Sequence, residues 1–306
     1  MDIFTNKNEG RLRTIWRLVA FIAITFFTIL PIVIISSELG VPEIYPALLW
    51  KIAVIGAVVF TALKIDKRSL KSLGVLIDRR WLREFILGIC IAALAMTLIF
   101  LLFLAMDWIE VTGYGWSRPG FWSGFIVFLF HMVLVGIWEE IAFRGYFITN
   151  IAEGFTSKYI SVEVACLAAM ALTSFFFGFV HLNNPNADWS STINIMLAGF
   201  VLAVPFILTG QLALSIGLHF SWNFFQGGIF GFKVSGNRIE HTLFRIREIG
   251  PDTWTGGQFG PEAGISGMLG LALLLILVIM YTRKADYNMD VNLTLKKSDN
   301  DTGRVL

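Results

Sequence analysis

The stretch Glu139-Glu140-Ile141-Ala142-Phe143-Arg144-Gly145 places three ionisable side chains in a chain segment whose preceding residues, 121–138, are largely apolar. An ionisable residue at the centre of a membrane helix costs about 2.5–3.5 kcal/mol on insertion scales, so it indicates function by default. Glu140 and Arg144 are one helical turn apart with the acid first, which is the favourable order for an ion pair. Glu139 points roughly 100° away and has no partner nearby in the sequence, so it is available for chemistry.

The composition predicts a polytopic membrane protein. The chain has 306 residues, of which 56% are hydrophobic and 15% are charged, whereas soluble domains carry about 25% charged residues. The net charge of +2 and the lack of a basic run with interleaved aromatic residues argue against a nucleic-acid partner. Cys90 and Cys166 lie in apolar runs, which favours buried packing thiols over a disulfide or a metal site.

The apolar runs predict an all-α, polytopic transmembrane bundle of about eight spans. The first run, residues 18–35, is longer than the apolar core of a signal peptide, so we expect an uncleaved membrane helix. Only Gly145 interrupts the fourth run, so this helix should continue to residue 152 with Gly154 as its cap. That length brings Glu139 near mid-helix. The predicted spans are residues 15–35, 47–63, 84–106, 121–152, 159–182, 191–208, 212–225 and 264–281.

An even number of spans puts both termini on one side of the membrane. The segments on the side of the termini hold 18 Lys or Arg residues and the opposite segments hold 6. Positively charged loops stay in the cytoplasm, so we expect cytoplasmic N- and C-termini. The expected location is a multi-pass integral membrane protein, which in a prokaryote means the cell inner membrane.

Two further polar motifs lie in apolar helices. Phe177-Gly178-Phe179-Val180-His181 ends the fifth span, and His219-Phe220-Ser221-Trp222-Asn223 lies in the seventh, with His219 and Asn223 on one face. Taken singly, such residues can be a structural ion pair, an imidazole that reaches the interface or hydrogen-bonding glue between helices. Together they supply two acids, two imidazoles and a carboxamide. His131 has no motif around it and is interpreted as a packing or hydrogen-bonding residue.

The order Glu-Glu-x3-Arg, Phe-x3-His, His-x3-Asn on successive apolar helices resembles the CAAX protease and bacteriocin-processing family, whose members include Ras-converting and Abi-type intramembrane endopeptidases. The resemblance covers residues 121–228. It implies that Glu139 is the catalytic acid assisted by His181, and that His219 and Asn223 support the oxyanion. Glu140 and Arg144 correspond to a supporting pair.

The resulting division of the chain has one bundle and no internal repeat. The predicted parts are a polar N-terminal tail (1–10), transmembrane helices 1–3 (11–120), the family-like catalytic core with helices 4–7 (121–228), an outer loop (229–262), the last transmembrane helix (263–282) and a polar, disordered C-terminal tail (283–306). Nothing catalytic is expected of the outer loop or of the tail.

The chemistry of the motif residues is compatible with amide hydrolysis. A carboxylate activates water when desolvation raises its pKa toward neutrality, and preorganised donors stabilise the tetrahedral intermediate. Glutamate catalysis without a cofactor is therefore the prediction. A zinc protease is the alternative, because Glu139, His181 and His219 are zinc ligand types, although the chain has no His-Glu-x-x-His helix.

Two other classes of function remain open from the sequence. A non-catalytic membrane scaffold would use the polar set to bind a partner helix, and a proton-coupled transporter would use it as an ion pathway. The expected partners are membrane lipid and a peptide or protein substrate, with or without a lipid anchor. The apolar helices do not distinguish CAAX tails from bacteriocin-like leader peptides.

Overall fold

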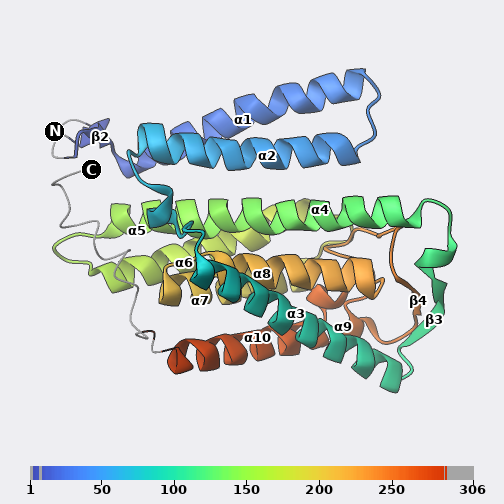
Figure 1. Ribbon diagram of the computed structural model, residues 1–306. Helices are drawn as coiled ribbons and strands as arrows, with labels where there is room; N and C mark the ends of the chain where they lie inside the picture. The colour runs from blue at the N-terminus through green and yellow to red at the C-terminus, as the bar shows by residue number, and fades with distance from the viewer. Residues whose placement is uncertain (1–2, 7–8, 286, 288–306) are drawn as a thin grey trace.

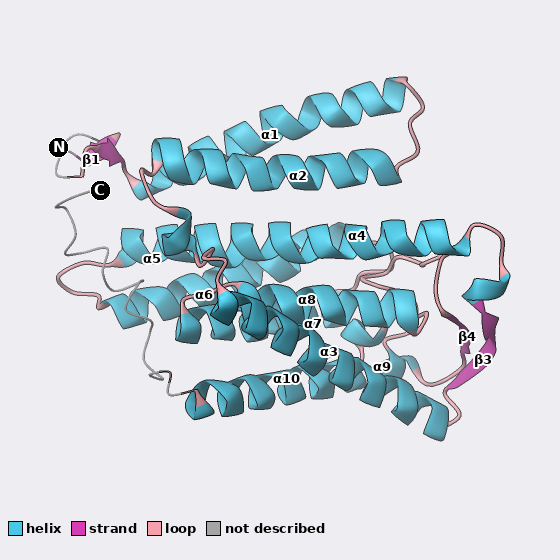
Figure 2. Cartoon of the chain, viewed as in Figure 1, coloured by secondary structure: helices cyan, strands magenta, loops and turns pink. Residues whose placement is uncertain are grey.

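A computed structural model describes residues 3–6, 9–285 and 287, and it is an all-α bundle with two small antiparallel sheets (Figures 1 and 2). The elements, in chain order, are β1 (Thr5–Asn6), β2 (Arg11–Leu12), α1 (Thr14–Glu38), α2 (Ile44–Phe60), η1 (Thr61–Ile65), η2 (Leu70–Leu73), α3 (Arg79–Ala105), β3 (Ile109–Tyr114), η3 (Gly115–Ser117), α4 (Phe121–Glu139), η4 (Glu140–Ile148), α5 (Thr149–Phe155), α6 (Val162–Val180), η5 (His181–Asn183), α7 (Trp189–Thr209), α8 (Ala213–Asn223), η6 (Phe224–Ile229), β4 (Phe244–Glu248), α9 (Asp252–Thr255), η7 (Pro261–Ala263) and α10 (Ile265–Lys284).

The chain is an integral multi-pass membrane protein. In the described residues, seven helical segments are long and apolar enough to cross a bilayer: Thr14–Glu38, Ile44–Ile65, Arg79–Ala105, Phe121–Phe155, Val162–Asn183, Trp189–Thr209 and Ile265–Lys284. The eighth predicted span corresponds to α8 and η6, which together cover 17 residues, 213–229, or about 25 Å of helix. Every residue of α8 is buried, so this rod lies inside the bundle. The start of α1 and the end of α10 lie at the same end of the bundle (Figure 1), as an even number of rods requires.

The fourth span is one continuous rod made of α4, η4 and α5. The predicted continuation beyond residue 147 is confirmed, but the rod reaches Phe155 and the predicted cap at Gly154 is wrong. Thr156 is the C-terminal cap residue. A Cβ on Gly154 would lie 2.9 Å from Cγ2 of Thr14, so this glycine permits close packing on α1. The middle of the rod, η4, is a π-helix, a wider form often found at functional sites.

Helices α3 and α8 cross at two glycines. A Cβ on Gly217 would lie 2.2 Å from the carbonyl oxygen of Phe85, and a Cβ on Gly88 would lie 2.6 Å from that of Leu214. Small residues allow membrane helices to approach this closely. The contact fixes α8, and with it His219 and Asn223, against the rest of the bundle.

Several predicted boundaries differ from the structure for local reasons. Helix α3 begins at Arg79 rather than at residue 84, because the side chain of Asp78 accepts a hydrogen bond from Trp81 N at 2.7 Å. Helix α6 begins at Val162 rather than at residue 159, after the N-cap Ser161. Cys166 is buried as predicted, whereas Cys90 is exposed on α3, and neither forms a disulfide.

The predicted outer loop has regular structure. Strand β4 pairs antiparallel with β3, from Ile109 opposite Glu248 to Tyr114 opposite Phe244. This sheet lies at the end of the bundle opposite α5 (Figure 2). The predicted polar C-terminal tail begins with the last turn of α10, Arg283 and Lys284, and positions 286 and 288–306 lie outside the described residues.

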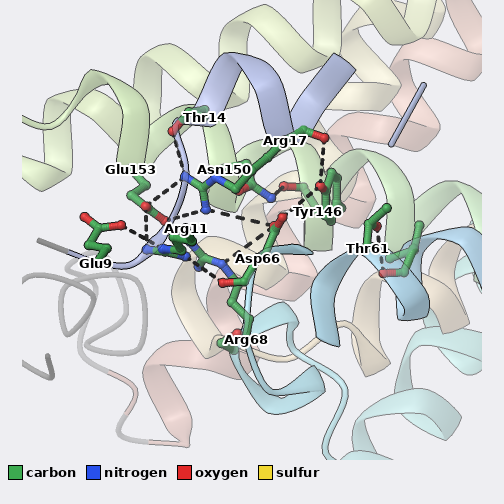
Figure 3. A network of polar contacts seen from close by, with 12 residues as sticks. Glu9, Arg11, Thr14, Arg17, Thr61, Asp66, Arg68, Tyr146, Asn150 and Glu153 are labelled. Carbon is green, nitrogen blue, oxygen red and sulfur yellow. Dashed lines mark hydrogen bonds and ion pairs between the residues drawn. The ribbon is translucent and has the colours of Figure 1, made fainter. Parts of the chain in front are cut away.

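A network of ion pairs joins the N-terminal hairpin to the ends of α2 and α5 (Figure 3). Glu153 accepts hydrogen bonds from Arg11 at 2.7 Å and from Arg17 at 2.8 Å, and it pairs with Arg68. Asp66 is fully buried and lies 4.0 Å from both Arg17 and Arg68. Opposite charges that are buried together offset part of their desolvation cost. The network anchors α1 on the rod that carries Glu139.

Candidate active site

The four predicted catalytic residues line one cavity of about 640 Å³. Glu139 ends α4, His181 begins η5, and His219 and Asn223 lie one turn apart on α8. Glu139, His219 and Asn223 expose 7–8% of their surface, and His181 is half-buried. The continuous α4–η4–α5 rod thus brings Glu139 to the cavity that the far end of α6 also reaches.

The imidazole of His219 lies between two carboxylates. Its Nδ1 is 2.7 Å from Oε1 of Glu140, and its Nε2 is 3.7 Å from Oε2 of Glu139. The contact at 2.7 Å requires Nδ1–H to donate to Glu140, because a carboxylate only accepts. This bond fixes the ring, and Nε2 is the nitrogen that faces Glu139. The two adjacent acids therefore lie next to different nitrogens of the same imidazole ring.

Arg144 links Glu140 to two neighbouring helices. Its guanidinium donates to Oε1 of Glu140 at 2.9 Å and to the carbonyl oxygen of Gly199 on α7 at 3.0 Å. It also lies 4.4 Å from the ring centroid of Phe177 on α6. Arg144 and Glu140 are 2% and 0% exposed. Each neutralises the charge of the other, which burial without a partner would make very costly. The predicted i,i+4 pair thus forms within the π-helix.

Phe177 also sets the orientation of His181. Nδ1 of His181 lies 2.6 Å from the carbonyl oxygen of Phe177, so this nitrogen carries a hydrogen and donates. Its Nε2 is then the nitrogen left for a substrate or water. The Phe177 ring packs 4.8 Å from the His181 ring and 6.0 Å from the His219 ring. The Phe-x3-His motif therefore holds both imidazoles.

Asn223 presents an uncommitted carboxamide to the cavity. In the part of the chain that the structure describes, its side chain makes no hydrogen bond. Asn223 is nevertheless buried, with 7% of its surface exposed, and it lines the cavity. A carboxamide has two N–H donors. Asn223 can therefore donate to a group that enters the cavity without breaking an existing bond.

The cavity wall also contains polar residues that belong to none of the three motifs. Lys51 of α2 and Asn194 of α7 are each 4% exposed and line the cavity, as does His131, which was interpreted as a packing or hydrogen-bonding residue. From the predicted outer loop, Glu262 accepts hydrogen bonds from the backbone N and Oγ of Ser235 at 2.7 and 2.9 Å. Burial raises the pKa of Glu262, and these hydrogen bonds oppose the rise. Lys51 could have been predicted from the sequence as a functional residue, because it is a lone cation in an apolar helix.

The predicted alternative zinc ligands do not form a preformed metal site. Within residues 3–6, 9–285 and 287, no three His, Cys, Asp or Glu side chains form a group that could hold a metal ion. One nitrogen of His219 is occupied by Glu140, and the other is 3.7 Å from Glu139. Zinc ligands lie about 2.0–2.2 Å from the metal, so two ligands of one tetrahedral ion are about 3.4 Å apart, close to the Glu139–His219 distance. No third ligand joins this pair in the described residues, and the zinc alternative stays a prediction.

A second, larger cavity lies beside the first. It measures about 890 Å³ and is lined by apolar residues of α1, α5 and α6 and by Arg13, Arg17 and Glu153 near the N-terminal hairpin. None of the predicted catalytic residues lines it, but Phe143 and Val180 line both cavities. These two side chains therefore form part of the wall between the two cavities.

Comparison with known proteins agrees with the resemblance drawn from the motifs. Residues 121–225 match a protein-family model described as type II CAAX prenyl endopeptidase Rce1-like. The match covers about a third of the chain, from the start of α4 to the second residue of η6, and contains all six motif residues. No curated protein and no solved structure matches the chain. Over these residues the chain is similar to the type II CAAX prenyl endopeptidases of the Rce1-like family.

Proposed function

We propose that the chain is an intramembrane endopeptidase in which Glu139 activates a water molecule for attack on a peptide bond. The observation that carries the proposal is the distance of 3.7 Å between Oε2 of Glu139 and Nε2 of His219, inside a cavity that His181 and Asn223 also line. An acid, two imidazoles and a free carboxamide around one space can supply the general base and the oxyanion donors for amide hydrolysis.

In the proposed reaction, the Glu139 carboxylate takes a proton from water while the oxygen attacks the substrate carbonyl carbon. His181 helps to align this water through Nε2, because its Nδ1–H is committed to Phe177. The resulting tetrahedral intermediate collapses with cleavage of the C–N bond. The leaving amine takes the proton that Glu139 has gained, directly or through His181, so the acid returns to its starting state.

The negative oxygen of the intermediate needs donors that are already in place. Asn223 supplies an N–H without losing a bond of its own. His219 supplies one from Nε2 only when its ring carries both protons, because Nδ1–H already donates to Glu140. Glu140, held by Arg144, favours that state by its charge. This role makes Glu140 a positioning residue rather than the base.

The CAAX-type and leader-processing versions of this function differ only in the substrate. The test compares membrane proteins and peptides from cells that express the wild type, Glu139→Gln or the control Glu110→Gln, whose exposed side chain lies on β3. We expect an uncleaved polypeptide to accumulate only with Glu139→Gln, and the C-terminus or leader that it retains identifies the substrate class.

The alternative of a non-catalytic scaffold makes the opposite prediction. A folded Glu139→Gln protein that leaves the set of membrane peptides unchanged, while Gly217→Leu abolishes the phenotype, would support the scaffold and contradict the peptidase. Cleavage of a purified peptide by wild type and its loss in Glu139→Gln would decide for the enzyme.

A further inference from the structure

Glu262 is a further carboxyl group on the wall of the proposed active site. It lies in η7, outside the segment that matches the family model, is 8% exposed and lines the same cavity as Glu139. The charges of His181 and His219 act on Glu262, which places it within electrostatic range of both imidazoles. The predicted outer loop therefore contributes an acid to the cavity.

The carboxyl group of Glu262 is held in one orientation. Its Oε2 accepts the two hydrogen bonds from Ser235 N and Oγ, at 2.7 and 2.9 Å. Ser235 lies in a tight turn between Val234 and Asn237, which exchange backbone hydrogen bonds at 3.0 and 2.9 Å. Oε1 of Glu262 accepts no hydrogen bond in the described residues and keeps some accessible surface. It is therefore the oxygen that a group in the cavity can reach.

The surroundings of Glu262 favour its protonated form. In the described part of the chain, no lysine, arginine or histidine nitrogen lies within 4.0 Å of this carboxyl group, whereas Glu140 pairs with Arg144. Burial raises the pKa of Glu262 more than the hydrogen bonds from Ser235 lower it. A carboxylic acid that its surroundings keep neutral can donate a proton. The other charged or titratable groups on the cavity wall are Lys51, His131, Glu139, His181, His219 and Arg238.

The motif residues do not include a group that starts the reaction with a proton for the leaving amine. Nδ1–H of His181 donates to the carbonyl oxygen of Phe177, so Nε2 of the neutral ring carries no hydrogen. Glu139 has to start as a carboxylate, because it acts as the base. An amine leaves a tetrahedral intermediate only after its nitrogen gains a proton, which a general acid supplies.

We propose that Glu262 is the general acid, which donates the proton on Oε1 to the leaving nitrogen as the C–N bond breaks. This inference rests on the proposed function and assigns a catalytic residue to the outer loop. The electron pair of the C–N bond stays on nitrogen, which bonds to the proton, and Glu262 becomes a carboxylate. The proton that Glu139 took from water then passes to Glu262 through Nε2 of His181 or through water, so both acids regain their starting states.

The test compares an amide with a thioester, whose leaving group needs no proton. The amide is the peptide that spans the cleavage site identified with Glu139→Gln, and the thioester has sulfur in place of the scissile nitrogen. A thiol with a pKa of about 8.5 leaves readily as the thiolate. With purified full-length protein in detergent at pH 7, Glu262→Gln should lower kcat about 100-fold or more for the amide, and less than about threefold for the thioester.

Three further variants complete the test. Glu262→Asp keeps a proton donor and should show a smaller loss, again confined to the amide. Ser235→Ala keeps the carboxyl group and one of its two hydrogen bonds, so it should retain the wild-type ratio of amide to thioester turnover. Glu240→Gln, at an exposed position of the same loop, is the matched control and should behave as wild type. Thermal unfolding of each variant verifies that it is folded.

A purely structural role for Glu262 predicts equal losses for both substrates. Equal losses in Glu262→Gln, or wild-type turnover of the amide by this variant, would overturn the inference. If Glu262→Gln does not fold, the same comparison in Glu262→Asp decides. Glu139→Gln separates the two proposals, because attack by water needs the base for either substrate. Amide cleavage that persists in Glu139→Gln contradicts the proposed function, whereas a required Glu139 with equal losses in Glu262→Gln contradicts the general acid alone.

Discussion

Nδ1 of His219 lies 2.7 Å from Oε1 of Glu140, and Nη1 of Arg144 lies 2.9 Å from the same oxygen. One carboxylate oxygen thus joins α8 to the π-helical part of the fourth span. Glu140 is fully buried, whereas its neighbour Glu139 faces the cavity. We therefore expect the stability of the site to depend on Glu140, and the proposed chemistry to depend on Glu139.

Replacing each acid by its amide should separate these roles. Glu140→Gln leaves the buried guanidinium of Arg144 without a counter-charge, and we expect a loss of about 3–5 kcal/mol in the free energy of unfolding. Glu139→Gln should change stability by less than about 1 kcal/mol, because this acid makes no hydrogen bond in the described residues. Thermal unfolding in detergent measures both. Equal destabilisation by the two variants would contradict the division of roles.

The glycine contact between α3 and α8 should be intolerant of even one methyl group. In Gly217→Ala the new Cβ would lie 2.2 Å from the carbonyl oxygen of Phe85, and backbone cannot rotate away as a side chain can. Overpacking of this kind typically costs about 1–3 kcal/mol, occasionally more. We expect a lower melting temperature and less monodisperse protein in size-exclusion chromatography. Gly56→Ala, where nothing lies within 4 Å of the new Cβ, is the matched control and should behave as wild type.

Much of this arrangement was predictable, because apolar length determines where membrane helices form and isolated polar residues mark their functional faces. The ion pair of Glu140 and Arg144 follows from helical spacing alone. The bond from His219 to Glu140 does not, because 79 residues separate its two members and only tertiary packing brings them together. The same holds for Glu262, whose loop showed no apolar periodicity. The start of α3 at Arg79 was not predicted, because the basic residues around its N-cap Asp78 are more typical of a loop than of a membrane helix.

Asn223 should affect turnover without affecting stability. Asn223→Ala removes a proposed oxyanion donor, for which the usual loss in kcat is about 10²–10³-fold. The carboxamide makes no hydrogen bond in the described part of the structure, so the melting temperature should stay close to that of wild type. The control Asn183→Ala alters an exposed residue of η5. A large fall in melting temperature for Asn223→Ala would show a structural role instead.

The ion network at the N-terminal hairpin should contribute more to the free energy of unfolding than an exposed ion pair does. Glu153→Gln removes the carboxylate that Arg11, Arg17 and Arg68 share. We expect a loss of about 3 kcal/mol, since breaking a buried pair on one side leaves charges uncompensated. Glu110→Gln, which breaks the exposed pair with Arg247, should cost at most about 1 kcal/mol. Chemical or thermal unfolding of the two variants, measured side by side, tests this ranking.

Glu248 should make the stability of the β3–β4 sheet depend on pH. Burial raises the pKa of Glu248 from 4.5 to about 6, although Thr255 donates a hydrogen bond to it at 2.7 Å and opposes the rise. The folded state then holds a proton that the unfolded chain has already lost between these two pH values. The free energy of unfolding should therefore be highest below about pH 4.5 and fall as the pH rises through 6, by about 1–2 kcal/mol from this group.

Glu248→Gln keeps an acceptor for Thr255 and removes the titration. The variant should match the wild type near pH 4.5 and be more stable than it at pH 7, in thermal unfolding followed in detergent at both values. Glu110→Gln on the partner strand is the control for a general effect of charge on this sheet. If the wild type and Glu248→Gln lose stability in parallel between pH 4.5 and 7, the carboxyl of Glu248 does not cause the pH dependence, because the variant lacks only this titratable group.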